Sequence, residues 1–298
     1  MLALVGPTAS GKTEAALAIA QHLGAEIVSV DSMLVYRGMD VGTGKPTAEQ
    51  RAAVPHHLLD VAEPSERFTV ARFQGLARST LRSVPHPLLV GGSGLYLRAV
   101  VDDLGFPPED PVVRASLEAE ADDLGAEELY RRLADMDPVA AARIEPGNVR
   151  RIIRALEVTA ISGAPFSSFA ASWDRYDADR VRAVGIRMDP EALRRRIAER
   201  VFVMLGNGWL DEVRVLMDRG FGAWLTASQA IGYAELAEHL DGRLSLDEAA
   251  ERTVKRTKEL ARRQMAWFRR DPRIRWFDAG AGGASEVTED IRAYLGSA

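Results

Sequence analysis

The stretch LALVGPTASGKTEAALAIA, which runs from Leu2 to Ala20, decides the fold of this chain. Its first apolar residues predict a strand over Leu2–Val5, and the apolar spacing beyond the turn predicts a helix over Gly11–Leu23. The turn fits the pattern G-x-x-x-x-G-K-[ST], whose fixed positions are Gly6, Gly11, Lys12 and Thr13. A strand, glycine-rich loop and helix in this order cradle phosphates with backbone N–H groups. The pattern does not reveal which molecule carries those phosphates.

Further strands and helices alternate along the chain. Short apolar runs predict strands at Glu26–Val30, Pro87–Val90, Val181–Met188 and Ile274–Phe277. Helical spacing and capping residues predict helices at Phe68–Ser83, Pro190–Leu205, Asp211–Arg219 and Ser245–Phe268. The alternation predicts an α/β fold with a parallel sheet flanked by helices, whose ligands bind at the carboxyl ends of the strands.

The middle of the chain has a different pattern. From Phe106-Pro107-Pro108 to about Ser172 no strand is predicted, whereas amphipathic spacing predicts three helices. They span Pro111–Asp123, Ala126–Met136 and Asn148–Ser162. We therefore predict an all-helical insertion over residues 109–176 within a core of residues 1–108 and 177–298. The long Gly- and Pro-containing loop Asp40–His57 is expected to be functional.

Composition narrows the class of protein. The chain has 298 residues and no cysteine, which excludes disulfides and thiolate sites. Its net charge of −5 on its own argues weakly against nucleic-acid binding. No apolar run is long enough for a membrane helix, and no signal peptide is evident, which favours a cytoplasmic protein. Two basic clusters nevertheless predict a local site for a polyanion. They lie between Arg252 and Arg275 and at Arg143, Arg150, Arg151 and Arg154.

Polar residues at the strand ends are the candidates for chemistry. Asp31 follows one strand, where it is a metal ligand, a general base or a turn residue. The strand ending at Val90 continues into a Gly-Gly-Ser-Gly turn without the carboxylate an ATP hydrolase usually places there, and Ser93 supplies a hydroxyl. Arg196 and Arg200 share one helix face, from which one can reach a phosphate. The pair His56-His57 lacks a third metal ligand at usable spacing, so a structural role is favoured.

Several blocks together are more specific than the phosphate loop. They are GPTASGKT (Gly6–Thr13), SVDSMLVYRGMDVGTGKP (Ser29–Pro46), PHHLLDV (Pro55–Val61), LLVGGSGLY (Leu88–Tyr96), DPVAAARI (Asp137–Ile144), RALEV (Arg154–Val158), QAIGY (Gln229–Tyr233) and RRQMAWFRRD (Arg262–Asp271). In this order, and over almost the whole chain, they closely resemble the bacterial tRNA dimethylallyltransferases, also called tRNA isopentenyltransferases.

The resemblance implies a P-loop NTPase-like core in which the loop holds a prenyl diphosphate in place of ATP. That loop is Gly6, Pro7, Thr8, Ala9, Ser10, Gly11, Lys12 and Thr13. The implied enzyme transfers the dimethylallyl group of dimethylallyl diphosphate to N6 of the adenosine 3′ to the anticodon, in tRNAs reading UNN codons. It implies Asp31 as general base, with Lys12, Ser93 and Arg200 as further catalytic residues and Mg²⁺ at Thr13. Ser93 replaces the threonine usual in the family, which keeps the hydroxyl but removes a methyl group.

The resemblance also implies the residues that contact the tRNA anticodon stem-loop. They are Asp31, Ser32, Met33, Leu34, Ser93, Arg114, Arg150, Arg151, Ile152, Ile153, Arg154, Gln229, Ala230, Ile231, Gly232, Tyr233 and Ala234. A monomer with no membrane association and no obligate protein partner is expected. Two alternatives remain open: a small-molecule P-loop kinase, which leaves Ser29–Pro46 unexplained, and a non-catalytic RNA-binding module, which leaves the phosphate loop unexplained.

Overall fold

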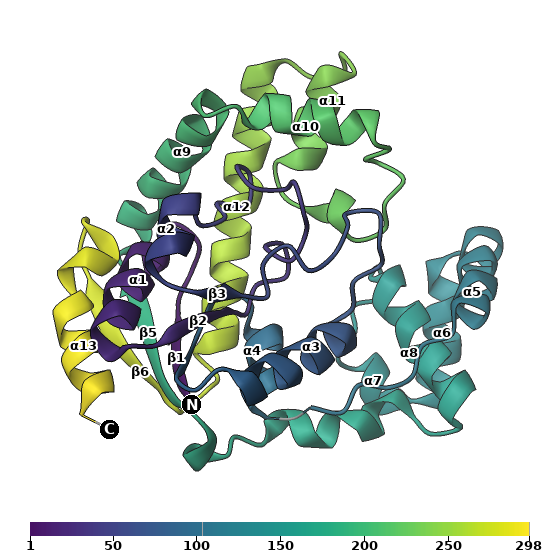
Figure 1. Cartoon of the computed structure of the whole chain (residues 1–298). Coiled ribbons are helices and arrows are strands. Elements are labelled where there is room, and N and C mark those ends of the chain that lie inside the picture. The colour runs from purple at the N-terminus through teal and green to yellow at the C-terminus, as the bar shows by residue number, and fades with distance from the viewer. Residues whose placement is uncertain (103, 298) are drawn as a thin grey trace. The chain divides into compact units, whose positions relative to one another are not determined.

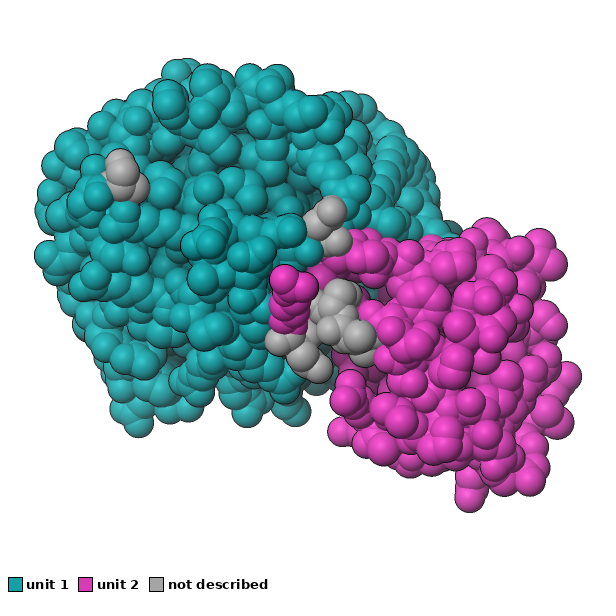
Figure 2. All heavy atoms as spheres, turned by 90° about the horizontal axis from the view of Figure 1, so that it is seen from below, with its two compact units in different colours: residues 1–102, 176–298 teal, residues 103–175 magenta. Residues whose placement is uncertain are grey.

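A six-stranded sheet carries the phosphate loop in the computed structural model of the chain (Figure 1). The structure describes residues 1–102 and 104–297. The chain divides into two compact units, one of residues 1–102 with 176–298 and one of residues 103–175, which Figure 2 colours separately. Within the described residues, no helix combines the length and apolar character needed to cross a membrane.

All strands of the sheet run parallel, in the order β3-β2-β4-β1-β5-β6. Their bounds are β1 Leu2–Val5, β2 Glu26–Ser29, β3 His56–His57, β4 Pro87–Gly91, β5 Arg182–Met188 and β6 Ile274–Ala279. Val5 pairs in register with Gly91 on one side and Gly185 on the other. The predicted α/β fold with a parallel sheet is therefore confirmed. Three polar turns, after β1, β2 and β4, emerge at one edge of the sheet.

Helices of the first unit begin where local signals place them. Asp189 caps α9 by accepting from the N–H groups of Glu191 and Ala192, and Ser245 forms the predicted capping box with Glu248 at the start of α12. The bounds in this unit are α1 Lys12–Leu23, α2 Ala48–Ala53, α3 Val70–Ser83, α4 Gly94–Val101, α9 Pro190–Gly206, α10 Trp209–Asp218, α11 Tyr233–Leu240, α12 Leu246–Phe268 and α13 Thr288–Gly296. The long helix α12 packs against α4, α9 and α11 (Figure 1).

The region predicted as one long loop, Asp40–His57, contains two elements that the sequence pattern does not predict. Thr47 and Gln50 cap the short helix α2 reciprocally. His56 and His57 form the edge strand β3, which is held by pairing with Ile27 and Val28 rather than by any pattern of its own. His57 Nε2 lies 2.6 Å from a carboxylate oxygen of Glu26, in agreement with the structural role favoured for the histidine pair.

The second unit is helical. Its elements are α5 Pro111–Leu124, α6 Ala126–Met136, α7 Pro138–Ala141, α8 Val149–Ser162 and the 3₁₀ helix Phe166–Asp174. Leu117, Leu133 and Leu156 are among the buried residues of its own hydrophobic core. No strand occurs among its described residues, as the sequence pattern predicts for this region.

Candidate functional site

The phosphate loop is held in place from outside. Gln264 of α12 accepts from the N–H group of Thr8 at 2.9 Å, and Arg196 of α9 donates to the Ala9 carbonyl at 3.0 Å. Ala9 and Gly11 adopt left-handed backbone with φ of 63° and 85°, which turns the chain sharply into α1. Within the described ranges, no protein group accepts from the N–H groups of Ala9, Gly11, Lys12 or Thr13. The loop therefore offers several donors to an anion at a helix start.

Lys12 is crowded by other groups. Its ammonium donates to the Pro7 carbonyl at 2.6 Å. Burial and the neighbouring charge of Arg200 lower the pKa of Lys12 to about 8, against the opposing charges of Asp31 and Glu14. A dianionic ligand beside this ammonium would raise the pKa again, so binding of such a ligand is coupled to protonation of Lys12.

Arg200 joins two cavities of the first unit. One cavity, of about 840 Å³, is lined by the phosphate loop and α9, and we call it the P-loop cavity. The other, of about 590 Å³, is lined by Asp31 and residues of α9, α10 and α12, and we call it the Asp31 cavity. Arg200 and Met204 line both. Burial lowers the pKa of Arg200 from its very high ordinary value, but a guanidinium stays charged in proteins.

The P-loop cavity has the chemistry of an anion site. Gly11 and Thr13 of the loop meet Arg196 and Arg200 there, and Gly44 and Lys45 form part of another wall. It thus brings together an N–H-rich loop, a hydroxyl and guanidinium groups.

The Asp31 cavity brings together segments that lie about two hundred positions apart in the sequence. Asp31, Ser32 and Met33 line it together with Gln229, Ala230, Ile231 and Tyr233. Arg256 and Arg263 of α12 also reach it, so a basic face of that helix borders the same space. Leu34, Ser93, Gly232 and Ala234 are not among its lining residues.

Asp31 has the turn role that was one of the three open from the sequence. Its Oδ1 accepts from the backbone N–H groups of Met33 at 2.8 Å and Leu34 at 3.4 Å, which is the arrangement of an Asx turn. No group in the described part of the chain donates to its Oδ2. The turn fixes the carboxylate at the cavity and leaves one oxygen available to accept a proton.

Ser93 stands at the start of α4, where its side chain makes no capping hydrogen bond. The preceding turn is tightly packed, because a Cβ on Gly91 would come within 2.3 Å of the Val30 carbonyl oxygen and one on Gly92 within 2.4 Å of the Gln264 amide nitrogen. Ser93 therefore follows a turn that packs against Val30 and Gln264, and it lines neither the P-loop cavity nor the Asp31 cavity.

The candidate RNA-contacting residues of the helical unit differ in burial and in ion pairing. Arg114 and Arg154 donate to the buried carboxylate of Glu157 at 2.5 and 2.8 Å. Burial alone would raise the pKa of Glu157, but these hydrogen bonds lower it. Ile152 and Ile153 are buried and pack in the hydrophobic core of the unit. Arg150 and Arg151 are exposed on α8.

Comparisons with known proteins decide the family. A family model described as IPP transferase matches residues 34–271, and one described as isopentenyl transferase matches residues 1–60. The chain belongs to the IPP transferase family. The resemblance in the sequence blocks is thereby confirmed.

Relatives within the IPP transferase family are similar over almost their full length. The tRNA dimethylallyltransferase of Salinispora tropica is 47% identical over 98% of this chain and 92% of its own. That of Kineococcus radiotolerans is 49% identical over 95% of this chain and 92% of its own. The crystal structure of the tRNA isopentenylpyrophosphate transferase from Bacillus halodurans is 39% identical, with a TM-score of 0.71 over 99% of this chain and 95% of that chain. This similarity confirms the P-loop NTPase-like core.

Two residues of the site were missed by sequence reasoning. Gln264 supports the phosphate loop, and its place in the block RRQMAWFRRD was the available signal. Glu212 of α10 accepts hydrogen bonds from the backbone of the loop after Met39. Nothing in the sequence distinguishes Glu212 from the adjacent acidic residue Asp211, so sequence reasoning could not have singled it out. The described residues contain no group of three His, Asp or Glu side chains suited to a metal ion. Members of this family nonetheless depend in general on a divalent metal.

Proposed function

We propose that the chain transfers the dimethylallyl group of dimethylallyl diphosphate to N6 of the adenosine 3′-adjacent to the anticodon, in tRNAs reading UNN codons. The observation that carries the proposal is the pair of cavities meeting at Arg200, one at the phosphate loop and one at Asp31. The names of the relatives support tRNA as the acceptor and a prenyl group as the cargo. Because its acceptor is tRNA, we propose a cytoplasmic location.

In the proposed reaction the exocyclic nitrogen of adenine attacks the allylic carbon. This nitrogen is a poor nucleophile because its lone pair is delocalised into the ring. Asp31 Oδ2 takes a proton from N6 as the C–N bond forms. The Asx turn keeps Asp31 oriented during this step, which favours it as the base. The Ser93 hydroxyl is proposed to orient the reacting groups, since no capping bond occupies it.

The C–O bond to diphosphate breaks as the C–N bond forms, and its electron pair leaves with the diphosphate. Donors placed where this negative charge grows lower the barrier. The proposed donors are the N–H groups of the loop Gly6–Thr13, the Lys12 ammonium and the Arg200 guanidinium. Lys12 stays protonated beside the anion although its pKa is about 8 in the free protein.

Mg²⁺ is the metal we propose, and the donor set fits it. Mg²⁺ keeps several waters and uses few protein ligands together with substrate phosphates. The Thr13 hydroxyl, which lines the P-loop cavity, would be one such ligand, and the diphosphate would supply others. The ion would add charge stabilisation for the leaving group.

The tRNA contacts that we propose follow the exposed and cavity-lining residues. The segments Gln229–Ala234 and Asp31–Leu34 are proposed to contact the tRNA, and their cavity-lining members Asp31–Met33, Gln229–Ile231 and Tyr233 to receive the adenine. The adenine must leave the anticodon-loop stack to enter the Asp31 cavity. Arg256 and Arg263 border that cavity and are proposed to contact phosphates nearby. In the helical unit, Arg150 and Arg151 remain the proposed contacts.

A transfer assay tests the function. Protein is incubated with dimethylallyl diphosphate, Mg²⁺ and unmodified transcripts of tRNAs that read UNN codons, and the nucleosides are analysed by mass spectrometry. Formation of N6-dimethylallyladenosine is expected. Failure with every such tRNA contradicts the proposal, and ATP consumption with a small acceptor would instead favour a kinase.

A further inference from the structure

A second glycine-rich loop, Asp40–Lys45, forms part of the boundary between the two cavities. Asp40, Val41, Gly44 and Lys45 of this loop line the P-loop cavity, whereas its Gly42 and Thr43 line the Asp31 cavity. We call it the partition loop. Because Arg200 also lines both cavities, the loop and this arginine border the space in which a donor and an acceptor would meet.

The partition loop fits only without side chains at two points. Gly44 has φ of +65°, and a Cβ there would lie 1.9 Å from Nη2 of Arg200. A Cβ on Gly42 would lie 2.0 Å from the indole nitrogen of Trp209. A shift of this loop by an ångström would therefore change the packing of Arg200.

Glu212 holds the partition loop from the side of α10. Its Oε2 accepts from the N–H groups of Asp40 and Val41, each at 2.8 Å, and its Oε1 accepts from that of Gly42 at 3.2 Å. The same Oε1 accepts from the hydroxyl of Tyr233 at 2.6 Å. One carboxylate thus ties three consecutive backbone groups to a residue of the Gln229–Ala234 segment.

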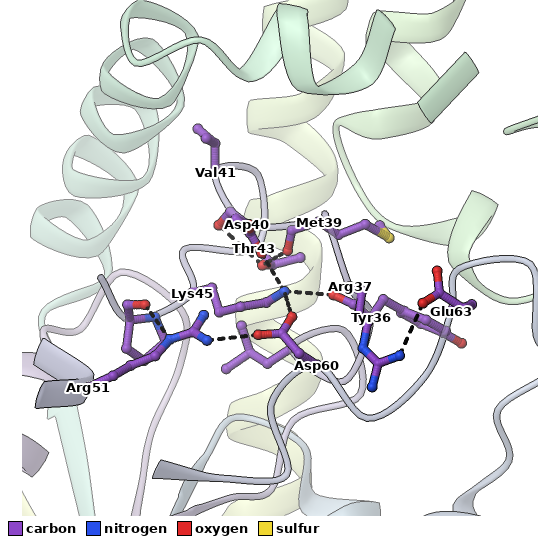
Figure 3. Close-up of polar contacts among 12 residues, drawn as sticks. Tyr36, Arg37, Met39, Asp40, Val41, Thr43, Lys45, Arg51, Asp60 and Glu63 are labelled. Atoms are coloured by element: carbon purple, nitrogen blue, oxygen red, sulfur yellow. Dashed lines mark hydrogen bonds and ion pairs between the residues drawn. The ribbon is translucent and has the colours of Figure 1, made fainter. Parts of the chain in front are cut away.

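Lys45 holds the other end of the loop (Figure 3). Its ammonium, on a side chain only 1% exposed, donates to the Tyr36 carbonyl at 2.6 Å and to Asp60 at 2.7 Å, and it also contacts Asp40. Arg51 of α2 donates to the second oxygen of Asp60 at 2.8 Å. The loop is anchored at both ends, and of the two anchors only Glu212 also binds a residue of the Asp31 cavity.

We propose that Glu212 is a positioning residue for the transfer: by binding the partition loop and Tyr233 together, it aligns the two cavities across Arg200. This inference rests on the proposed function. Alignment matters because a misplacement of about 1 Å between reacting groups costs on the order of 100-fold in rate. Glu212 supplies no proton and touches no reacting atom in this role.

The variant Glu212→Gln tests the inference. Its amide nitrogen cannot accept a hydrogen bond, so at least one of the four donors loses its acceptor. We expect the single-turnover rate constant at saturating dimethylallyl diphosphate and tRNA to fall roughly 10- to 100-fold. The affinity for dimethylallyl diphosphate alone should change less than about threefold, because the phosphate loop is untouched. A wild-type rate constant in this variant overturns the inference.

Two further variants keep the test decisive. Tyr233→Phe removes one of the four hydrogen bonds and keeps the ring, so it should fold and lower the rate constant by a smaller factor than Glu212→Gln. If Glu212→Gln does not fold, an unchanged rate constant in Tyr233→Phe overturns the inference. Asp211→Asn is the matched control, because this neighbour is exposed and, among the residues the structure describes, pairs only with Arg214 on the surface. A lowered unfolding temperature with a normal rate constant per folded molecule would indicate a purely structural role and refute positioning.

Absence of transfer by the wild type would count against the proposed function, not against the positioning role of Glu212.

Discussion

Two loops of this protein contain the dipeptide Gly-Lys, and the structure uses them in opposite ways. In the phosphate loop, Lys12 follows Gly11, and the N–H groups of Ala9 and Gly11–Thr13 have no acceptor among the described residues. In the partition loop, Lys45 follows Gly44, and Glu212 takes up the N–H groups of Asp40–Gly42. The first loop is open to a ligand and the second is closed on the protein's own carboxylates.

The difference teaches that the neighbours of a loop decide what it does. Within the described residues no carboxylate pairs with the Lys12 ammonium, and burial together with the charge of Arg200 lowers its pKa to about 8 against the charges of Asp31 and Glu14. Lys45 contacts both Asp40 and Asp60. An uncompensated cation favours an incoming anion, whereas a compensated one stabilises the fold.

The largest expected effect comes from a residue outside both loops. Asp31→Asn keeps the size of the side chain and removes the base. We expect the single-turnover transfer rate to fall about 10²–10⁴-fold, with tRNA affinity nearly unchanged in a filter-binding measurement. An unchanged rate would exclude Asp31 as the general base.

Lys12→Ala should separate binding from stability. We expect affinity for dimethylallyl diphosphate, measured by calorimetry, to fall about 10- to 100-fold, because a charge-assisted contact to the diphosphate is lost. The unfolding free energy should change little, since the partly buried Lys12 ammonium has no carboxylate partner among the described residues and donates only to the Pro7 carbonyl. Unaltered donor affinity would contradict the assignment of the phosphate loop.

Lys45→Met should give the reverse result. It removes the partner of Asp40 and Asp60, and we expect a loss of about 2 kcal/mol in unfolding free energy by urea titration, less than for a fully buried pair because both carboxylates are partly exposed. Donor affinity should change far less than in Lys12→Ala. If Lys45→Met lost more binding free energy for dimethylallyl diphosphate than unfolding free energy, the contrast between the two loops would be wrong.

The smallest effect is a dependence of donor affinity on pH. Below the lowered pKa of Lys12 the ammonium is already charged, and above it binding must take up a proton. From about pH 8 to about pH 9 we expect the affinity for dimethylallyl diphosphate to fall up to about tenfold. Calorimetry on the protein without tRNA measures this affinity. Lys12→Arg is the control: it stays charged, so this step should disappear. A step of the same size in Lys12→Arg would place the titrating group elsewhere.

Local signals made much of the architecture predictable. The strand, turn and helix at Leu2–Leu23, the cap at Ser245 and the position of Asp31 after a strand all depend on neighbours in the sequence. What escaped prediction depends on distant partners. Glu212 meets its donors across about 170 positions of sequence, and β3 exists only because β2 lies beside it. The buried Ile152 and Ile153 pack in a core to which residues of α5, α6, α7 and α8 contribute.

Glu157 has a consequence for the ionic strength dependence of RNA binding. Each arginine that neutralises a phosphate releases condensed counterions, which steepens the fall of affinity with salt. Arg114 and Arg154 already share the Glu157 carboxylate, so they release fewer counterions than their number in the sequence suggests. For the tRNA contact proposed at this unit, we therefore expect a salt titration to give a shallower slope than a count of Arg114, Arg150, Arg151 and Arg154 would predict.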